Sequence, residues 1–395
     1  MGGQALTGPN PLRLNELGLD ALEASQLDQA IQYLTAATEA DPSQPTLWMN
    51  LAKAHRTAAD DEGERAALEK VLEIDQLHLM ARLRLAELHE RRSELGAATD
   101  HWAIFLGICA SIPNHTPELA AMIRHAREFV EVRRQALADA VDDGLGEALT
   151  SASERDRRRA SAAADLMLGR RKTYANQCHG FFYPFLPADE FFDRGHFPWL
   201  TKLEAATAVI REELEAILAS PDPGLSPYIE MPPGTPENLW SELDKSANWS
   251  ALHLWRDGRR IDEVCKRAPK TAELVESLPL AHIPGRAPAV FFSILKAGKR
   301  IPPHTGVTNI RTIIHLPLIV PDGCWLRVGN ETRRWEEGKL LIFDDSFEHE
   351  AKNDSDQTRI VLLFDIWRPE LNDGEKAGIS DLFDTIDRFT TISDA

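Results

Sequence analysis

An internal repeat near the N-terminus constrains the fold of this chain more than any other feature. A leucine followed directly by a small residue recurs with a period of about 34 residues, at Leu17-Gly18, Leu51-Ala52 and Leu85-Ala86. Apolar residues recur later in each unit with the same period, at Leu34, Leu68 and Trp102 and then at Ala37, Val71 and Phe105. Small residues let helices cross closely, so each unit is predicted to be a helix-turn-helix that buries its apolar face by stacking on its neighbours.

The repeated pattern resembles tetratricopeptide repeats and runs from about Leu12 to about Asn114, although Glu64 occupies a position usually given to Ala. We expect about three such units within residues 1–116. Stacked repeats of this kind form a concave groove that binds extended peptides or partner helices. The first part of the chain is therefore predicted to serve recognition rather than chemistry.

Residues 117–172 are predicted to form a helical connector, because they are rich in Ala, Arg and Glu at helical spacing. We expect an interruption near Gly144 and Gly146. The basic run from Arg155 to Arg159 is interpreted as a solvated helix face rather than a binding patch, because the chain as a whole is acidic.

The charge of the chain excludes several classes of partner. Sixty-two acidic and 44 basic side chains give a net charge of −18, which phosphate backbones and anionic membranes would repel. No apolar stretch approaches the roughly 18 residues that span a bilayer, and the opening residues MGGQALTGPNPLR lack the apolar core of a secretory signal. The cysteines lack CxxC or zinc-like spacing and are interpreted as reduced thiols. We therefore expect a cytoplasmic protein without nucleic acid or membrane partners.

The second half of the chain has a different composition pattern, with aromatic residues, prolines and short apolar alternations after about Tyr174. Strands are predicted at Ala289–Leu295, Asn309–Val320, Cys324–Val328, Lys339–Phe343 and Arg359–Trp367. Turn residues separate them at Pro321-Asp-Gly323, Gly329-Asn330 and Gly338. Short strands at this spacing are typical of a sandwich or jelly roll, so the whole chain is predicted to be an α+β multidomain protein.

Two histidines of the β-rich region are candidates for metal binding. His304 lies in the predicted turn Pro302-Pro-His-Thr-Gly306, and His349 follows a predicted strand. A jelly roll can bring both imidazoles to one mouth of the barrel, and imidazole suits iron well. On its own, a histidine in a Pro-rich turn is more often a surface or capping residue.

Two arginines are predicted to point into the barrel. Strand alternation places Arg311, Ile313 and His315 on one face, opposite Ile310, Thr312, Ile314 and Leu316. On the last strand Arg359 shares a face with Val361, Leu363 and Asp365. Burying a guanidinium is costly unless an anion meets it, and its planar fork binds both oxygens of a carboxylate. The alternative for Arg359 is an ordinary salt bridge at a strand edge.

Three segments together resemble the aspartyl/asparaginyl β-hydroxylase family, namely residues 304–316, 329–351 and 358–371. Upstream segments at 181–186, 197–200 and 254–259 are similar to the beginning of that family's domain. Some members also carry tetratricopeptide repeats ahead of the catalytic domain, as in this chain. The resemblance implies that residues 173–395 form a double-stranded β-helix, a jelly-roll and cupin-like oxygenase domain.

The resemblance also implies roles for individual residues. His304 and His349 correspond to the two iron ligands, Arg359 and Ser293 to the pair that binds the distal carboxylate of 2-oxoglutarate, and His315 to a residue near the metal-chelating end of this cosubstrate. Most oxygenases of the wider class add a carboxylate two residues after the first histidine. Here that position is Gly306, in agreement with a family that lacks this acid, and Asp345 is expected to hold a water in the vacant coordination place.

One residue departs from the family pattern. Many members have an Arg at the position of Ile313, where it contacts a carboxylate. Arg311, two residues earlier on the same face, is expected to take over that contact or to bind the substrate. The identity of the substrate is left open.

The function implied is that of an iron(II)- and 2-oxoglutarate-dependent dioxygenase, which uses O2 to hydroxylate the β-carbon of Asp or Asn residues in a peptide or protein, with the repeat groove as a place to hold it. A first alternative is the same chemistry on a small metabolite or peptide natural product. A second is a non-catalytic repeat scaffold with a decayed barrel. Retention of His304, His349, Arg359 and Ser293 together argues against decay.

Overall fold

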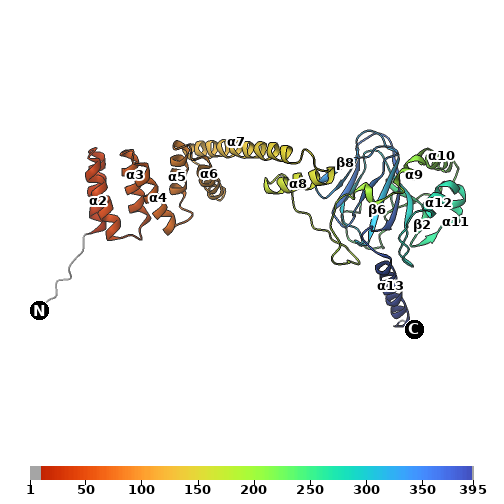
Figure 1. The fold of residues 1–395 in the computed structure, drawn as a ribbon. Coiled ribbons are helices and arrows are strands. Elements are labelled where there is room, and N and C mark those ends of the chain that lie inside the picture. Colours follow the sequence, from red (N-terminus) through yellow and green to blue (C-terminus); the bar gives the residue numbers. More distant parts are fainter. Residues whose placement is uncertain (1–9, 394–395) are drawn as a thin grey trace. The chain divides into compact units, whose positions relative to one another are not determined.

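The chain divides into two compact units, one ending at Leu168 and the other beginning at Gly169 (Figure 1). The structure is a computed structural model that describes residues 10–393. Most of the opening segment, on which the expectation of no signal peptide rests, lies outside the described residues. The predicted division into residues 1–116, 117–172 and 173–395 stays a prediction.

The first unit consists of helices, of which the first six form three hairpins, α1 with α2, α3 with α4 and α5 with α6. The helices are α1 (Pro11–Glu23), α2 (Leu27–Ala40), α3 (Pro45–Thr57), α4 (Asp61–Ile74), α5 (Leu79–Arg91), α6 (Leu95–Cys109), α7 (Pro117–Ala148) and α8 (Glu154–Met167). Within residues 10–393, no helix combines the length and the apolar character needed to cross a membrane.

The hairpin turns repeat with the sequence. Ser25, Ala59 and Ser93 have positive φ angles of 60°, 55° and 57°, and each lies in the turn between the two helices of its hairpin, about 34 residues from the next. A Cβ added at Gly18 would lie 2.5 Å from Cγ of Leu34, so the first two helices approach more closely than a side chain permits. The predicted helical repeat is confirmed.

The predicted interruption of the connector at Gly144 and Gly146 is wrong, because α7 continues through both residues to Ala148. A glycine costs a helix only about 1 kcal/mol relative to alanine, which a long helix tolerates. The break comes later, where the side chain of Ser153 accepts a hydrogen bond from the backbone N–H of Asp156 and so caps α8.

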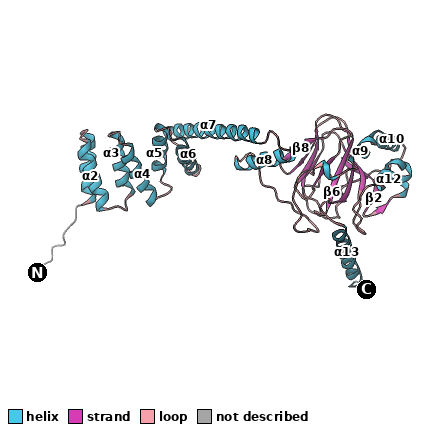
Figure 2. Cartoon of the chain, in the orientation of Figure 1, coloured by secondary structure: helices cyan, strands magenta, loops and turns pink. Residues whose placement is uncertain are grey.

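The second unit is built on two antiparallel sheets (Figure 2). The larger sheet has the strand order β1-β2-β4-β11-β6-β9, with β3 paired to β2, and the smaller sheet has the order β5-β10-β7-β8. The strands are β1 (Ser226–Pro227), β2 (Trp249–Arg256), β3 (Arg259–Arg260), β4 (Val290–Leu295), β5 (Arg300–His304), β6 (Arg311–Ile319), β7 (Cys324–Val328), β8 (Glu331–Arg334), β9 (Leu341–Phe343), β10 (His349–Asn353) and β11 (Arg359–Trp367). From β4 onward the chain passes repeatedly from one sheet to the other.

Helices cover one face of the larger sheet, and the smaller sheet faces the other. The covering helices are α9 (Leu200–Ala205), α10 (Thr207–Leu218), α11 (Asp262–Arg267) and α12 (Pro269–Glu276), while η1 (Arg194–His196) precedes them and α13 (Asp373–Ser393) follows the last strand. Strand β11 shows the two faces, since Leu362 and Phe364 pack in the core under the helices and Val361 packs in the core between the sheets. The space between the sheets is where inward polar residues meet.

The five predicted strands are present with small shifts at their ends, but others were missed. His304 is not in a turn, as predicted, but ends strand β5. This strand lies at the edge of the smaller sheet and pairs only with β10. Pro302 and Pro303 are tolerated there, because an edge strand does not need every N–H for pairing.

His253 on β2 gives a prediction about stability. Its buried Nδ1 has no hydrogen-bond partner among the described residues, and burial, together with nearby Arg256, lowers the pKa of its imidazole to about 4. A depressed pKa means that the associated stability is complete above about pH 6.5 and is lost as the pH falls toward 4. At pH 5 we expect His253→Phe, which keeps the packing against Phe291, to have a free energy of unfolding about 1 to 2 kcal/mol higher than that of the unmodified chain, as measured by urea titration. At pH 8 this gain in the free energy of unfolding should be absent. Equal gains at pH 5 and pH 8 would show that a lowered pKa of His253 is not their cause.

Candidate active site

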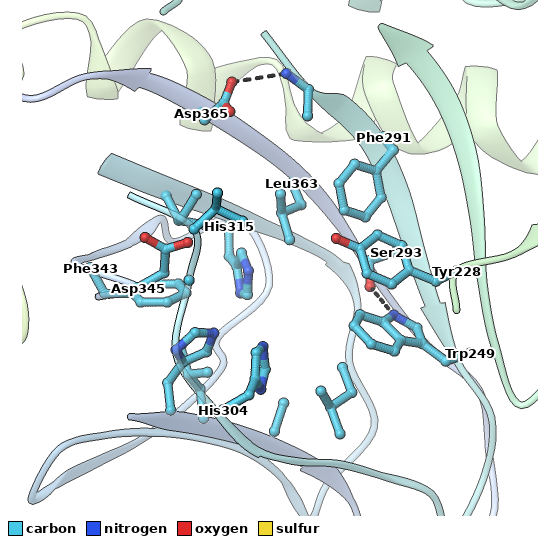
Figure 3. Close-up of a pocket in the computed structure, with 18 of the residues that line it drawn as sticks. Tyr228, Trp249, Phe291, Ser293, His304, His315, Phe343, Asp345, Leu363 and Asp365 are labelled. Carbon is cyan, nitrogen blue, oxygen red and sulfur yellow. Dashed lines mark hydrogen bonds between the residues drawn. The ribbon is translucent and has the colours of Figure 1, made fainter. Parts of the chain in front are cut away.

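A cavity of about 260 Å³ lies between the two sheets of the second unit (Figure 3). The inner faces of both sheets line it, together with loop residues at its mouth. All the side chains singled out from the sequence come together here, namely Ser293, His304, Arg311, His315, Asp345, His349 and Arg359. Gly306 and Ile313 line the same cavity.

His304 and His349 face each other across the pairing of β5 and β10, where they are register partners. Their ring centroids lie 4.1 Å apart. Nδ1 of His304 lies 2.8 Å from the carbonyl oxygen of Pro302, and Nδ1 of His349 lies 2.9 Å from that of Phe347. A carbonyl only accepts, so each Nδ1 carries the proton and each Nε2 keeps a lone pair. This is the tautomer that a histidine needs to bind a metal through Nε2.

Both imidazoles are held neutral. Burial lowers the pKa of His304, and burial, with the neighbouring His304, lowers the pKa of His349 to about 3. The ring of Trp240 meets His304 edge-on at 4.9 Å, and that of Phe343 lies 5.4 Å from His349. Neutral rings in a dry, aromatic setting are good nitrogen donors to a transition metal.

Arg359 is a buried cation with spare donors. It is 1% exposed, and burial lowers the pKa of its guanidinium to about 10. Its Nη1 donates to Oγ of Ser293 at 3.3 Å, whereas its buried Nε has no partner among the described residues. The indole of Trp249 donates to the same Ser293 hydroxyl at 3.0 Å, and the ring of Trp335 lies 4.7 Å from the guanidinium. The arrangement suits a buried anionic ligand, which would satisfy the unused donors.

His315, on β6, places its imidazole in the same cavity. In the described part of the chain, neither of its buried ring nitrogens has a partner. Burial, with the charge of Arg359, lowers the pKa of His315 well below its usual value, and the ring meets Phe343 edge-on at 5.0 Å. Buried polar groups are normally hydrogen-bonded, so a polar ligand in the cavity would satisfy the two unused nitrogens of this neutral imidazole.

Asp345 fills the space next to Gly306. A Cβ at position 306 would overlap the carboxylate of Asp345, so a larger residue there would require that side chain to move. The backbone N–H of Gly306 donates to the carbonyl oxygen of Asp345 at 2.6 Å, while Oδ1 of the buried carboxylate has no partner among the described residues. Burial raises the pKa of Asp345 to about 7. A carboxylate from another part of the chain therefore lies where a side chain two residues after His304 would be.

Arg311 does not present a free cation to the cavity. Its Nη1 donates to Oδ2 of the buried Asp365, and the other oxygen of Asp365 accepts from the backbone N–H of Ala289 at 2.9 Å. Burial raises the pKa of Asp365. The Nε of Arg311 still lacks a partner among the described residues, so one donor remains for a ligand.

The residues present fit a metal with few protein ligands. Among the described residues no group of three or more His, Cys, Asp or Glu side chains is arranged to hold a metal. A metal bound by His304 and His349 would therefore keep several coordination positions for small ligands. Arg359 and His315, with their unused nitrogens in the same cavity, are suited to orient such a ligand.

An aromatic wall in this cavity was missed from the sequence. Tyr228 stacks on Trp249 with ring centroids 4.0 Å apart and lies 5.1 Å from Phe291. Trp240 stacks on Trp249 at 6.3 Å. The signal available in the sequence was a clustering of Trp and Tyr between residues 228 and 249, but nothing there indicated which strand they would cover.

Arg368 was also missed, and it gives a stability prediction. Its fully buried guanidinium donates to Oδ2 of Asp344 at 2.5 Å and to the carbonyl oxygen of Asn309 at 3.3 Å. We expect Arg368→Met to lower the free energy of unfolding by roughly 3 to 5 kcal/mol, because the carboxylate of Asp344 would stay buried without its partner. Denaturant titration measures this loss.

The matched control is Arg334→Met, in which an exposed arginine is replaced and a change within about 0.5 kcal/mol is expected. Adding Asp344→Asn to Arg368→Met should recover part of the loss, since the buried charge is then gone. A double variant that is as unstable as the sum of the single variants would show that the two side chains are not coupled.

The sheets, the histidine pair and the buried arginine define the second unit as a β-sheet protein with an internal cavity lined by imidazoles and a guanidinium. Residues 204–369 match the family model described as aspartyl/asparaginyl beta-hydroxylase, and the second unit contains a domain of this family. Human aspartyl/asparaginyl beta-hydroxylase is 44% identical over 139 residues, which are 35% of this chain and 18% of that protein. The ornithine lipid ester-linked acyl 2-hydroxylase of Rhizobium tropici is 35% identical over 184 residues, 45% of this chain and 60% of that protein.

These matches cover less than two thirds of the length of either relative. For the helical unit, the first TPR of Spaghetti bound to an HSP90 peptide is 20% identical, with a TM-score of 0.27, over 31% of this chain and 94% of that one. The assignment of helical repeats therefore rests on the three helical hairpins described above.

Proposed function

We propose that this protein is an iron(II)- and 2-oxoglutarate-dependent dioxygenase that hydroxylates the β-carbon of Asp or Asn residues in a peptide or protein. The observation that carries the proposal is the paired imidazoles of His304 and His349, 4.1 Å apart, each with its Nδ1 hydrogen-bonded to the carbonyl oxygen two residues before it. They share one cavity with a buried arginine that has unused donors. The matched family model supports hydroxylation as the class of reaction.

In this proposal His304 and His349 hold iron through Nε2. Arg359 and Ser293 bind the distal carboxylate of 2-oxoglutarate, and His315 donates to its metal-bound end. Iron(II), with O2 and 2-oxoglutarate bound, supplies an oxidant able to remove hydrogen from an unactivated C–H bond, while the cosubstrate becomes succinate and carbon dioxide. The chain itself binds, orients and excludes water, and such positioning decides which carbon reacts.

Asp345 and Arg311 act beside this centre. The free Oδ1 of Asp345 would accept a hydrogen bond from a water in the coordination place that Gly306 leaves without a carboxylate. Arg311, steadied by Asp365, would contribute its remaining donor to a carbonyl or carboxylate of the cosubstrate or substrate.

The fold proposed for this unit is a double-stranded β-helix. The eight strands from β4 to β11 are divided equally between the sheets, with β4-β11-β6-β9 in one and β5-β10-β7-β8 in the other, and successive strands change sheet except for the paired β7 and β8. This order supports a jelly roll in which β5 and β10 are neighbours, although far apart in sequence. The two histidines meet because of that neighbourhood.

A peptide or protein substrate fits the repeat unit, because stacked helical hairpins bind extended segments in their groove. The specific alternative is the same chemistry on a small or lipid-like molecule. Ile313 favours this alternative, because it offers no charge for a carboxylate, and the Rhizobium relative is named as an acyl hydroxylase. Deleting residues 1–112 should abolish turnover of a protein substrate but spare turnover of a small molecule.

The test of the proposal is an anaerobic titration of the full chain with iron(II) and 2-oxoglutarate. A metal-to-ligand charge-transfer band should appear and should be lost in Arg359→Met. Admission of air with cell-extract peptides should then add one oxygen to Asp or Asn, detected by mass spectrometry. Absence of the band at saturating iron and 2-oxoglutarate would refute the proposal and favour a scaffold with a decayed site.

A further inference from the structure

A second cavity of about 660 Å³ adjoins the catalytic one. Ala289, Val307 and Arg311 line both cavities and so form the boundary that the two share. The second cavity lies against α13 through Phe383. The match to the family model ends at residue 369, before α13 begins at Asp373, so this wall is not part of the matched domain.

The wall made by α13 is fastened to the rest of the unit. The guanidinium of Arg286 donates through both terminal nitrogens to the carboxylate of Asp387, at 2.5 and 2.6 Å, and lies 4.5 Å above the ring of Phe383. Phe383 also meets the ring of Phe181 edge-on at 5.0 Å. Three separate segments of the chain are thereby held around one opening.

The lining of this cavity is apolar and its cations are already paired. The partly exposed rings of Phe181 and Phe383 supply its apolar surface, whereas Ile283 and Ile310 are almost fully buried. Arg286 is paired with Asp387 and Arg311 with Asp365, so each positive charge is already offset by a carboxylate of the protein. Burial of an apolar group here would be favourable, whereas burial of a further charge would not.

We propose that the cavity against α13 is a substrate subsite that takes a bulky apolar side chain adjacent to the residue hydroxylated in the catalytic cavity. This inference rests on the proposed function and adds the substrate class, a peptide with Leu, Ile, Met or Phe beside the target Asp or Asn. The shared lining by Arg311 and Val307 makes both subsites parts of one binding surface.

A peptide fits this cavity better than an acyl chain. The lining also includes polar groups of Asp257, Thr308 and Arg286, the last of which is paired with Asp387. Peptide N–H and C=O groups on either side of an apolar side chain can hydrogen-bond to such groups, whereas a methylene chain would only remove water from them.

The experiment uses the full chain loaded with iron(II) and 2-oxoglutarate without oxygen, so that binding is measured apart from turnover. Its probe is a peptide array with a central Asn or Asp and one neighbouring position varied over all residues. We expect Leu, Ile, Met or Phe at one neighbouring position to tighten binding roughly tenfold or more over Gly or Ser, as hydrophobic pockets do. Phe383→Ala should remove most of this preference, and Phe383→Trp should shift it toward Ala and Val.

Ile386→Ala is the matched control, because Ile386 is an exposed apolar residue of the same helix and lines neither cavity. It should leave the preference unchanged. The inference is overturned if binding does not depend on the neighbouring residue, or if both Phe383 variants retain the preference. The charge-transfer band reports separately on the proposed function. When air is admitted, oxygen added to an acyl lipid in micelles but to no peptide of the array would also overturn it.

Discussion

Replacement of His349 by Ala is expected to abolish both the charge-transfer band and hydroxylation, with a loss in rate of at least a factor of about 1,000, or roughly 4 kcal/mol of transition-state stabilisation. The reason is that only two protein groups in the described cavity are placed to hold iron, and a single imidazole from His304 leaves the metal without a chelate. His304→Ala is expected to have the same effect. The measurements are anaerobic spectroscopy with iron(II) and 2-oxoglutarate, and succinate release in air.

The control for this loss is His282→Ala, which removes an exposed imidazole of the same unit. Its band and its rate should equal those of the unmodified chain. Thermal melting of each variant without metal separates loss of the site from loss of the fold. A His349→Ala variant that keeps the band would contradict the assignment of this residue as a ligand.

Gly306→Asp is expected to inactivate the protein, and adding Asp345→Gly is expected to restore iron binding. In the single variant the new side chain overlaps the carboxylate of Asp345, and overpacking of this kind costs about 1 to 3 kcal/mol. In the double variant the carboxylate is moved from one loop to the other and lies two residues after His304. That is the spacing of a facial triad of two histidines and one carboxylate.

The single variant Asp345→Gly completes the series. It should bind iron more weakly or turn over more slowly by a factor of about 10 to 100, as expected when a group beside the metal shell is lost. The double variant should bind iron at least as well as this single variant, as measured by titration. If Gly306→Asp alone is as active as the unmodified chain, then the proximity of Gly306 and Asp345 has no functional meaning.

Much of the site could be predicted because strand alternation is a strong local signal. The alternation correctly separated Arg311, Ile313 and His315, which line the cavity, from Ile314 and Leu316, which pack under the helices. The same rule placed Arg359 and Asp365 on the inner face of β11. Convergence of the two histidines depends on the long-range pairing of β5 with β10, which no local pattern predicts; a jelly roll permits this convergence and the resemblance to a family implies it.

Other parts of the site have no local signal. The ion pair of Arg368 with Asp344, the overlap of Gly306 with Asp345 and the aromatic stacking around Trp249 all join segments distant in sequence. Strand β5 was taken for a turn because its prolines are unfavourable in most strands, and only its edge position makes them acceptable. The opposite error occurred in α7. Gly144 and Gly146 were expected to interrupt this helix, but the helix continues through both, because two glycines do not destabilise it enough to end it.

The hydrogen bonds of His304 and His349 have a consequence for how such a site responds to substitutions. Each ring is oriented by the carbonyl two residues before it in the chain, so the direction of each Nε2 is encoded within a few residues of its own strand. The cavity against α13 is lined instead by the loop around Arg286, the start of β6 and α13 itself. Substitutions in those segments would therefore change the shape of this cavity without altering the direction of either imidazole.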